Sequence, residues 1–91
     1  MVIDMLNHYR YGKGSKIFLS DLMVGESRIV DSVDIEIRFF NRLASMGICS
    51  GAKVTMVKNN FLLPVIIDVN GNKVALGRKM AEKILLKEEE K

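Results

Sequence analysis

Two side chains in this sequence stand out as metal ligands or nucleophiles, namely the single histidine, His8, and the single cysteine, Cys49. Tight sites for first-row transition metals gather three or four His, Cys or carboxylate ligands in a fixed cage. His8 and Cys49 lie about forty residues apart, and Asp4, four residues before His8, would add only a weak chelate on a helix. The sequence therefore predicts no tight metal site and leaves His8 and Cys49 as weak candidates for binding a transition metal.

The sequence also contains no nucleophile with a general base at a spacing that is known from catalytic motifs. Cys49 has no histidine near it in sequence, and a thiol without such a partner is usually a small packed hydrophobe. The segment YGKGSK, residues 11–16, is glycine-rich. It lacks the strand before it and the helix after it that a phosphate-binding loop requires. The sequence predicts a protein that is not an enzyme and that needs no cofactor.

Aromatic and basic side chains interleave near the N-terminus, a pattern typical of surfaces on which nucleic-acid bases stack. These residues are Tyr9, Arg10, Tyr11, Lys13 and Lys16. The charge of the chain is mild, however, with 14 basic against 11 acidic residues and a net charge of +3, and it is spread along the sequence. We expect no nucleic-acid partner and keep a small nucleic-acid-binding barrel as an alternative.

Length and composition indicate one domain, because 91 residues with 48% hydrophobic content suffice for a single core. A single cysteine excludes an intramolecular disulfide, which fits a reducing compartment. The N-terminal MVIDML carries an acid and leads into a polar run, so it does not read as a signal peptide. No apolar stretch approaches the roughly 18 to 20 residues of a membrane span. We expect a cytoplasmic protein.

An amphipathic helix is predicted from Asp34 to Gly47, with Asp34 as N-cap and Arg38 and Arg42 pointing outward. Its apolar stripe consists of Ile35, Phe39, Leu43 and Met46, widened by Ile37, Phe40 and Ala44. Gly47 is expected to end the helix with positive φ, and Ile48 to fold back onto the last turn as in a Schellman motif. Gly51 then fits the positive-φ position of a type II turn over residues 49–52.

The remaining segments read as short strands. ESRIVDSV, KVTMV, PVIIDV, NKVAL and Ile84–Leu86 have the β-branched or alternating character of strands, and Ser20 and Asp21 suit a cap or turn before the first of them. Asn70-Gly71 is the preferred pair for a two-residue type I′ hairpin. One helical turn is expected around Met80 and Ala81.

These elements predict a mainly β fold, a small partly open barrel of about five strands with the helix over one opening. The barrel domain is expected to cover residues 17–87. Residues 1–16 are aperiodic and polar, so we expect a flexible tail that the fold does not need, and residues 88–91 form a solvated end.

The segments LSDLMVGES, RLASMG, SGAKVTMV, PVIIDVNG, KVALG and AEKILL, taken in this order, resemble the FeoA family, small cytosolic proteins of bacterial ferrous iron uptake. The positions that carry the likeness are Leu43, Met46, Gly47, Ile48, Gly51, Val54, Pro64, Leu76, Ala81 and Ile84. Ser50 departs from the family, which usually has a proline before this glycine, and residues 1–16 have no counterpart.

The resemblance implies an SH3-like barrel that acts as an accessory to FeoB, the membrane protein that carries Fe²⁺ and has a cytoplasmic GTP-binding domain. Weak association with Fe²⁺ is compatible with the ligands above. A regulatory barrel that docks on an iron-dependent, DtxR-like repressor is an alternative. No helix-turn-helix precedes the barrel in this sequence, which weakens that alternative.

Residues 59–64, NNFLLP, place three large apolar side chains in a predicted connection between strands, where polar residues are usual. The loop either folds back as a lid on the barrel or presents an apolar contact to a partner. We expect Leu62 to face outward, with Phe61 or Leu63 as an inward anchor. Phe61, Leu62 and Leu63 are therefore the candidates for partner binding.

Overall fold

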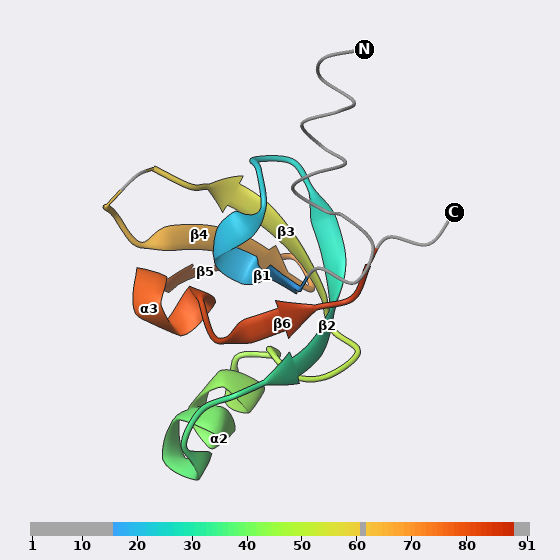
Figure 1. Cartoon of the computed structure of the whole chain (residues 1–91), viewed down its shortest axis with the longest axis vertical. Coiled ribbons are helices and arrows are strands. Elements are labelled where there is room, and N and C mark those ends of the chain that lie inside the picture. Colours follow the sequence, from blue (N-terminus) through green and yellow to red (C-terminus); the bar gives the residue numbers. More distant parts are fainter. Residues whose placement is uncertain (1–15, 61, 89–91) are drawn as a thin grey trace.

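The computed structural model describes residues 16–60 and 62–88 (Figure 1). The expectations for the N-terminal tail, for Asp4 and His8, for Phe61 and for the last three residues lie outside this part of the chain. The elements in order are β1 (Ile17–Phe18), the 3-10 helix η1 (Leu19–Asp21), β2 (Ser27–Val33), α2 (Ile37–Ser45), β3 (Lys53–Lys58), β4 (Val65–Val69), β5 (Asn72–Leu76), α3 (Arg78–Ala81) and β6 (Ile84–Leu86).

The six strands of the described chain form one antiparallel sheet in the order β1-β6-β2-β3-β4-β5. The predicted mainly β fold is confirmed, with one strand more than expected. The additional strand is β1, which has only two residues and so shows no alternation in the sequence. It is stabilised by pairing with β6 at the far end of the chain, Ile17 opposite Leu86. The backbone N–H of Phe18 also donates to Asp21 Oδ2 at 2.9 Å, which confirms the predicted capping role of Asp21.

Strand β2 joins the two halves of the sheet. Its residues Ser27–Ile29 pair with β3, and its residues from Val30 onward pair with β6. The register shifts between Val30 and Ser32, so one extra residue is accommodated there. An extra residue bends a strand and increases its twist. The sheet therefore curls around one core, and Val30 is fully buried within it.

The core is built from alternate residues of the strands, from one residue of each of η1, α2 and α3, and from the residues that follow η1 and α2. Its buried apolar members are Ile17, Leu19, Leu22, Val30, Leu43, Ile48, Val54, Met56, Val65, Ile67, Val69, Leu76, Ala81, Ile84 and Leu86. The period-2 alternation is clearest in β4, where Val65, Ile67 and Val69 point inward. These fifteen side chains form one contiguous cluster, to which every strand of the described chain contributes at least one residue, as expected for a single domain.

Helix α2 lies at one end of the sheet (Figure 1) and differs from the prediction at its start. It begins at Ile37 with Glu36 as N-cap and without a side-chain cap, so the assignment of Asp34 as N-cap is wrong. Asp34 instead lies two residues before the N-cap, and its backbone N–H donates to the carbonyl of Lys83 at 3.0 Å. The helix therefore begins two residues later than predicted.

The predicted width of the apolar stripe on α2 is also wrong. Leu43 is the buried residue of this helix, whereas Ile37 is 70% exposed, Phe40 is 37% exposed and Ala44 is exposed. A helix that rests on the end of a small sheet contacts it along one narrow face only. The residues that widen the stripe therefore remain in solvent.

The predicted turns are confirmed. Gly47 has φ of +89°, and the bonds Ile48 N to Leu43 O and Gly47 N to Ala44 O, both 2.9 Å, form the Schellman pattern. Gly51 has φ of +93° in a turn closed by Ala52 N to Cys49 O at 3.0 Å. Asn70 and Gly71 both have positive φ, as a type I′ hairpin requires.

Replacing Gly47 by alanine should destabilise the protein more than the same change at Gly51. Both glycines have positive φ, which costs an L-residue about 1–2 kcal/mol. At Gly47 an added Cβ would also lie 3.3 Å from Asn70 Nδ2 and from Val69 Cγ1, whereas at Gly51 nothing lies within 4 Å. Urea denaturation of the two variants measures the difference, and equal losses of stability would contradict close packing between the end of α2 and the β4–β5 hairpin.

Candidate docking surface

The loop between β3 and β4, residues 59–64, is here called the docking loop, and two apolar side chains among its described residues face solvent. Leu62 is 79% exposed and Leu63 is 54% exposed. The outward position of Leu62 agrees with the prediction. Leu63 is not the inward anchor, because its side chain is exposed, and Phe61, the other candidate for that role, lies outside the described residues.

Arg78, the first residue of α3, holds the docking loop. Its Nη2, which carries two hydrogens, lies within hydrogen-bond distance of three acceptors, Asn59 Oδ1 at 2.9 Å, the carbonyl of Asn60 at 2.6 Å and the carbonyl of Leu63 at 2.9 Å, so one hydrogen is shared between two of them. A guanidinium group is always charged and offers several N–H donors in a rigid plane, so it suits a cluster of carbonyl oxygens. The two loop carbonyls lie on either side of the apolar tip. Arg78 therefore fixes both ends of the segment that carries Leu62.

Asn59 extends this contact to the N-terminal part of the domain. Its Nδ2 donates to the carbonyl of Leu22 at 2.8 Å and to that of Ser20 at 3.2 Å, while its Oδ1 accepts from Arg78. We call Arg78, Asn59 and their bonds the clasp. Through the clasp, the docking loop, the η1 segment and α3 are held as one unit, which in Figure 1 lies on one side of the sheet.

The backbone of the docking loop is strained at its tip. Leu63 N donates to the carbonyl of Asn60 at 3.1 Å, and Leu62 has φ of +74° in this turn. Positive φ is common for glycine and asparagine, but for a bulky residue it costs of order 1–3 kcal/mol and persists only where the surroundings impose it. The clasp supplies that constraint. Its effect is to hold a large apolar side chain outward at a position where a turn would otherwise favour glycine.

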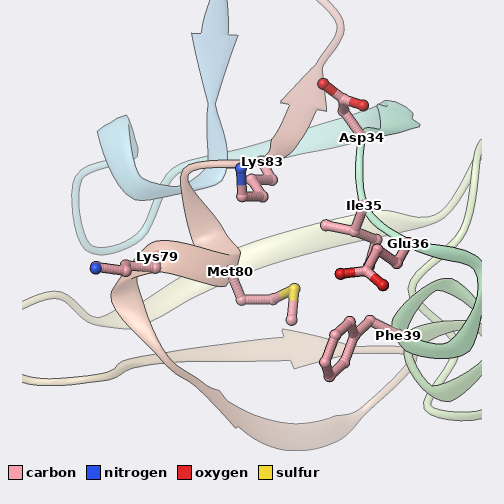
Figure 2. A pocket seen from close by; sticks show the side chains of 7 residues that line it. All are labelled: Asp34, Ile35, Glu36, Phe39, Lys79, Met80 and Lys83. Carbon is pink, nitrogen blue, oxygen red and sulfur yellow. The ribbon is translucent and has the colours of Figure 1, made fainter.

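A shallow groove of about 410 Å³ lies between α2 and α3 (Figure 2). It is lined by Asp34, Ile35, Glu36, Phe39, Lys79, Met80 and Lys83. Figure 2 shows Met80 and Phe39 pointing toward one another between the helices. Charges of both signs surround these apolar groups, and Glu36 is paired with Arg38 at 3.7 Å with both side chains exposed. Exposed pairs of this kind contribute little.

The candidate metal ligands are not brought together in the described part of the chain. Cys49 is exposed in the turn after α2, and His8 lies outside the described residues. Within residues 16–60 and 62–88, no group of three or more His, Cys, Asp or Glu side chains is placed to hold a metal ion. None of the helices described is long and apolar enough to cross a bilayer.

The curled antiparallel sheet, with a short helical turn before the last strand, defines a small SH3-like domain, and comparison with known proteins assigns it. The FeoA domain matches residues 17–88, so the chain belongs to the FeoA family. It is 39% identical over 66 residues to a Fe(2+) transport protein A of Methanocaldococcus jannaschii, a match that covers 72% of this chain and 79% of the relative.

Solved structures agree with this assignment. A crystal structure of an iron uptake regulatory protein, FeoA, superposes with a TM-score of 0.74 at 26% identity and covers 79% of this chain and 96% of its own. FeoA of Stenotrophomonas maltophilia, a zinc complex described as a prokaryotic SH3 domain protein, has a TM-score of 0.68 at 26% identity and covers 78% and 89%. The predicted SH3-like fold and the FeoA resemblance are confirmed.

The clasp itself was not predicted. The sequence pattern drew attention to the apolar residues of the docking loop, but Arg78 lies 15 to 19 residues from its three acceptors. Nothing in a run such as LGRKM distinguishes an arginine that binds carbonyls from one that faces solvent. The pair Asn59-Asn60 before an apolar run was the only available signal, because asparagine commonly bonds to backbone groups in turns.

Replacing Arg78 by lysine should lower the free energy of unfolding by about 1–3 kcal/mol, since the rigid guanidinium donors are lost while the charge remains. Urea denaturation measures this loss, and hydrogen exchange should show faster opening at Leu63. Lys79→Ala, one position away and exposed, is the matched control and should stay within about 0.5 kcal/mol. A stable Arg78→Lys variant with unchanged exchange at Leu63 would show that the clasp does not hold the loop.

Calorimetric titration with Fe²⁺ under anaerobic conditions should show weak binding or none, because His8 and Cys49 do not complete a cage of three or four ligands. Cys49→Ser should leave the isotherm unchanged. A submicromolar isotherm with one ion per chain that disappears in His8→Ala would contradict this expectation and would give the N-terminal residues a role in binding metal.

Proposed function

We propose that this FeoA-family protein is an accessory of ferrous iron uptake that acts by binding and not by catalysis, and that its partner is the cytoplasmic part of a FeoB-like iron transporter. The observation that carries the proposal is the docking loop, where Leu62 and Leu63 are exposed while the clasp holds their backbone. Membership of the FeoA family supports the link to Fe²⁺ transport. On this proposal the binding takes place in the cytoplasm.

The energetics favour a partner over permanent exposure. Burying a leucine side chain fully contributes roughly 1.5–3 kcal/mol. A partner that covers both Leu62 and Leu63 therefore gains enough free energy for a transient complex. Because the clasp has already ordered the loop, the complex avoids much of the entropy cost of ordering a flexible segment. The strained φ of Leu62 supports the same reading, since strain of this kind concentrates at functional sites.

A regulatory role on a metal-dependent repressor remains the second candidate, because the same fold occurs in such proteins. A manganese-dependent transcriptional repressor superposes with a TM-score of 0.70 at 19% identity, and the match covers 78% of this chain and 40% of the repressor. Similarity at this level of identity shows a common fold alone. The family assignment favours the transport role.

Leu62→Asp should weaken co-purification with the FeoB-like transporter while the fold remains stable within about 0.5 kcal/mol, because the side chain is exposed and aspartate tolerates positive φ better than leucine. Ile37→Asp on α2 is the matched control, since this residue is equally apolar and 70% exposed but lies outside the docking loop. Melting temperature and pull-down are measured for both variants.

Of these two variants, only Leu62→Asp should lose binding to the transporter. If the Leu62 variant binds the transporter as well as the wild type does, the docking loop is not the contact surface. If Ile37→Asp abolishes binding instead, the partner recognises α2.

A further inference from the structure

We propose that the partner adds an extended, acidic segment to the outer edge of β5, beside the docking loop. This inference rests on the proposed function and specifies the kind of element by which the same partner binds. Strand β5 is the last strand of the sheet and pairs with β4 only. In the described chain, no strand lies on its other side.

The register of the hairpin identifies the backbone groups that are available on this edge. Val69 and Asn72 flank the two-residue turn, so they form a hydrogen-bonded pair. Such pairs alternate along an antiparallel ladder, which assigns Val74 and Leu76 to bonding with β4 as well. The backbone groups of Lys73 and Ala75 consequently point away from β4.

These outward groups are accessible. Lys73 and Ala75 are both exposed, and none of the loop, turn or cap hydrogen bonds of the described residues uses their backbone N–H or C=O. Two residues spaced by two, each with a donor and an acceptor that no group of the described residues uses, match the spacing of an added antiparallel strand. The small side chain of Ala75 also leaves room for close approach.

The C-terminal end of β5 lies next to the docking loop. Leu76, at the end of β5, lies opposite Val65, the first residue of β4 after the loop. Arg78 follows two positions later and binds the carbonyls of Asn60 and Leu63. In Figure 1 the end of β5, α3 and the docking loop lie on the same side of the molecule. A segment paired with Lys73 and Ala75 can thus continue toward Leu62 and Leu63 as one binding surface.

The charges of β5 and α3 indicate that the partner segment is acidic. Strand β5 and α3 carry three bases, Lys73, Arg78 and Lys79, and no acidic residue, while Asp68 of β4 lies opposite Lys73 in the hairpin. Arg78 is committed to the clasp, but Lys73 and Lys79 are exposed. Lysine on an edge strand discourages pairing with neutral or basic strands. An acidic extended segment removes this obstacle, because opposite charges across strands are favourable.

The direct test is hydrogen exchange of single amides, followed by NMR, in the free protein and in its complex with the cytoplasmic part of the FeoB-like transporter. The Lys73 and Ala75 amides should exchange quickly in the free protein and at least about tenfold more slowly in the complex. The Val74 amide, already bonded to β4, serves as the internal reference. Unchanged fast exchange at Lys73 and Ala75 in a formed complex would overturn the inference.

A proline substitution separates this inference from the proposed function. Ala75→Pro removes an N–H that β4 does not use, and proline is tolerated on edge strands, so the free protein should fold normally. Its affinity for the transporter should fall about tenfold, the effect of roughly one or two lost bonds. Lys73→Gln removes the charge without placing a second acid opposite Asp68, should weaken binding as well, and supplies a second variant should Ala75→Pro fail to fold.

The outcomes are distinct. If Leu62→Asp loses binding while Ala75→Pro and Lys73→Gln retain it, the docking loop is the contact and the β5 inference is wrong. If the wild-type protein does not bind the transporter at all, the proposed function fails and this inference fails with it. If all three variants lose affinity and the two amides are protected, the partner binds both the loop and the strand edge.

Discussion

The hydrogen bonding of one strand holds this domain together. Because β2 pairs with β3 through its first residues and with β6 through its last, the two halves of the sheet share a single backbone. The register shift after Val30 lets that strand bend, and the sheet closes over a core with Val30 at its centre. The same curl brings η1, α3 and the end of β3 to one side of the molecule. Because these elements lie together, Asn59 bonds to the carbonyls of Ser20 and Leu22, and Arg78 bonds to Asn59.

The docking loop illustrates how a small domain can keep an apolar surface exposed without losing its order. A loop with two exposed leucines would normally collapse onto the core or remain mobile. Here its carbonyls are bound by a charged donor, and charged hydrogen bonds are roughly twice as strong as neutral ones. The cost of the positive φ at Leu62 is offset by these bonds. The result is a rigid apolar contact, which suits transient association better than a flexible one.

Local signals predicted most of the fold. The glycines and the Asn70-Gly71 pair were assigned correctly, because positive φ restricts residue choice so strongly that it can be seen in the sequence. The misassignments concern features that depend on distant contacts. Strand β1 is paired with Leu86 and its neighbour at the far end of the chain, and α2 begins only after Glu36, while Asp34 bonds to the Lys83 carbonyl. Exposure of Ile37 and Phe40 depends on how much of α2 the sheet end can cover, which periodicity alone does not determine.

The candidate docking surface was predictable only in part. Three apolar residues in a loop were a local anomaly and drew attention to Leu62. The clasp is a tertiary contact between Arg78 and residues up to 19 positions away, and the free groups of β5 follow from its register with β4. The family resemblance supplied the link to iron uptake, which no residue chemistry in the described chain specifies.

Binding through the docking loop is tested most directly by an NMR titration of the isotopically labelled protein with the cytoplasmic part of the FeoB-like transporter. The largest chemical-shift changes should occur at Asn60, Leu62, Leu63 and Arg78, while the turn at Cys49 and Gly51 and the outer face of α2 remain unchanged. Shift changes concentrated on Ile37 and Phe40, with the docking loop unaffected, would contradict binding through this loop.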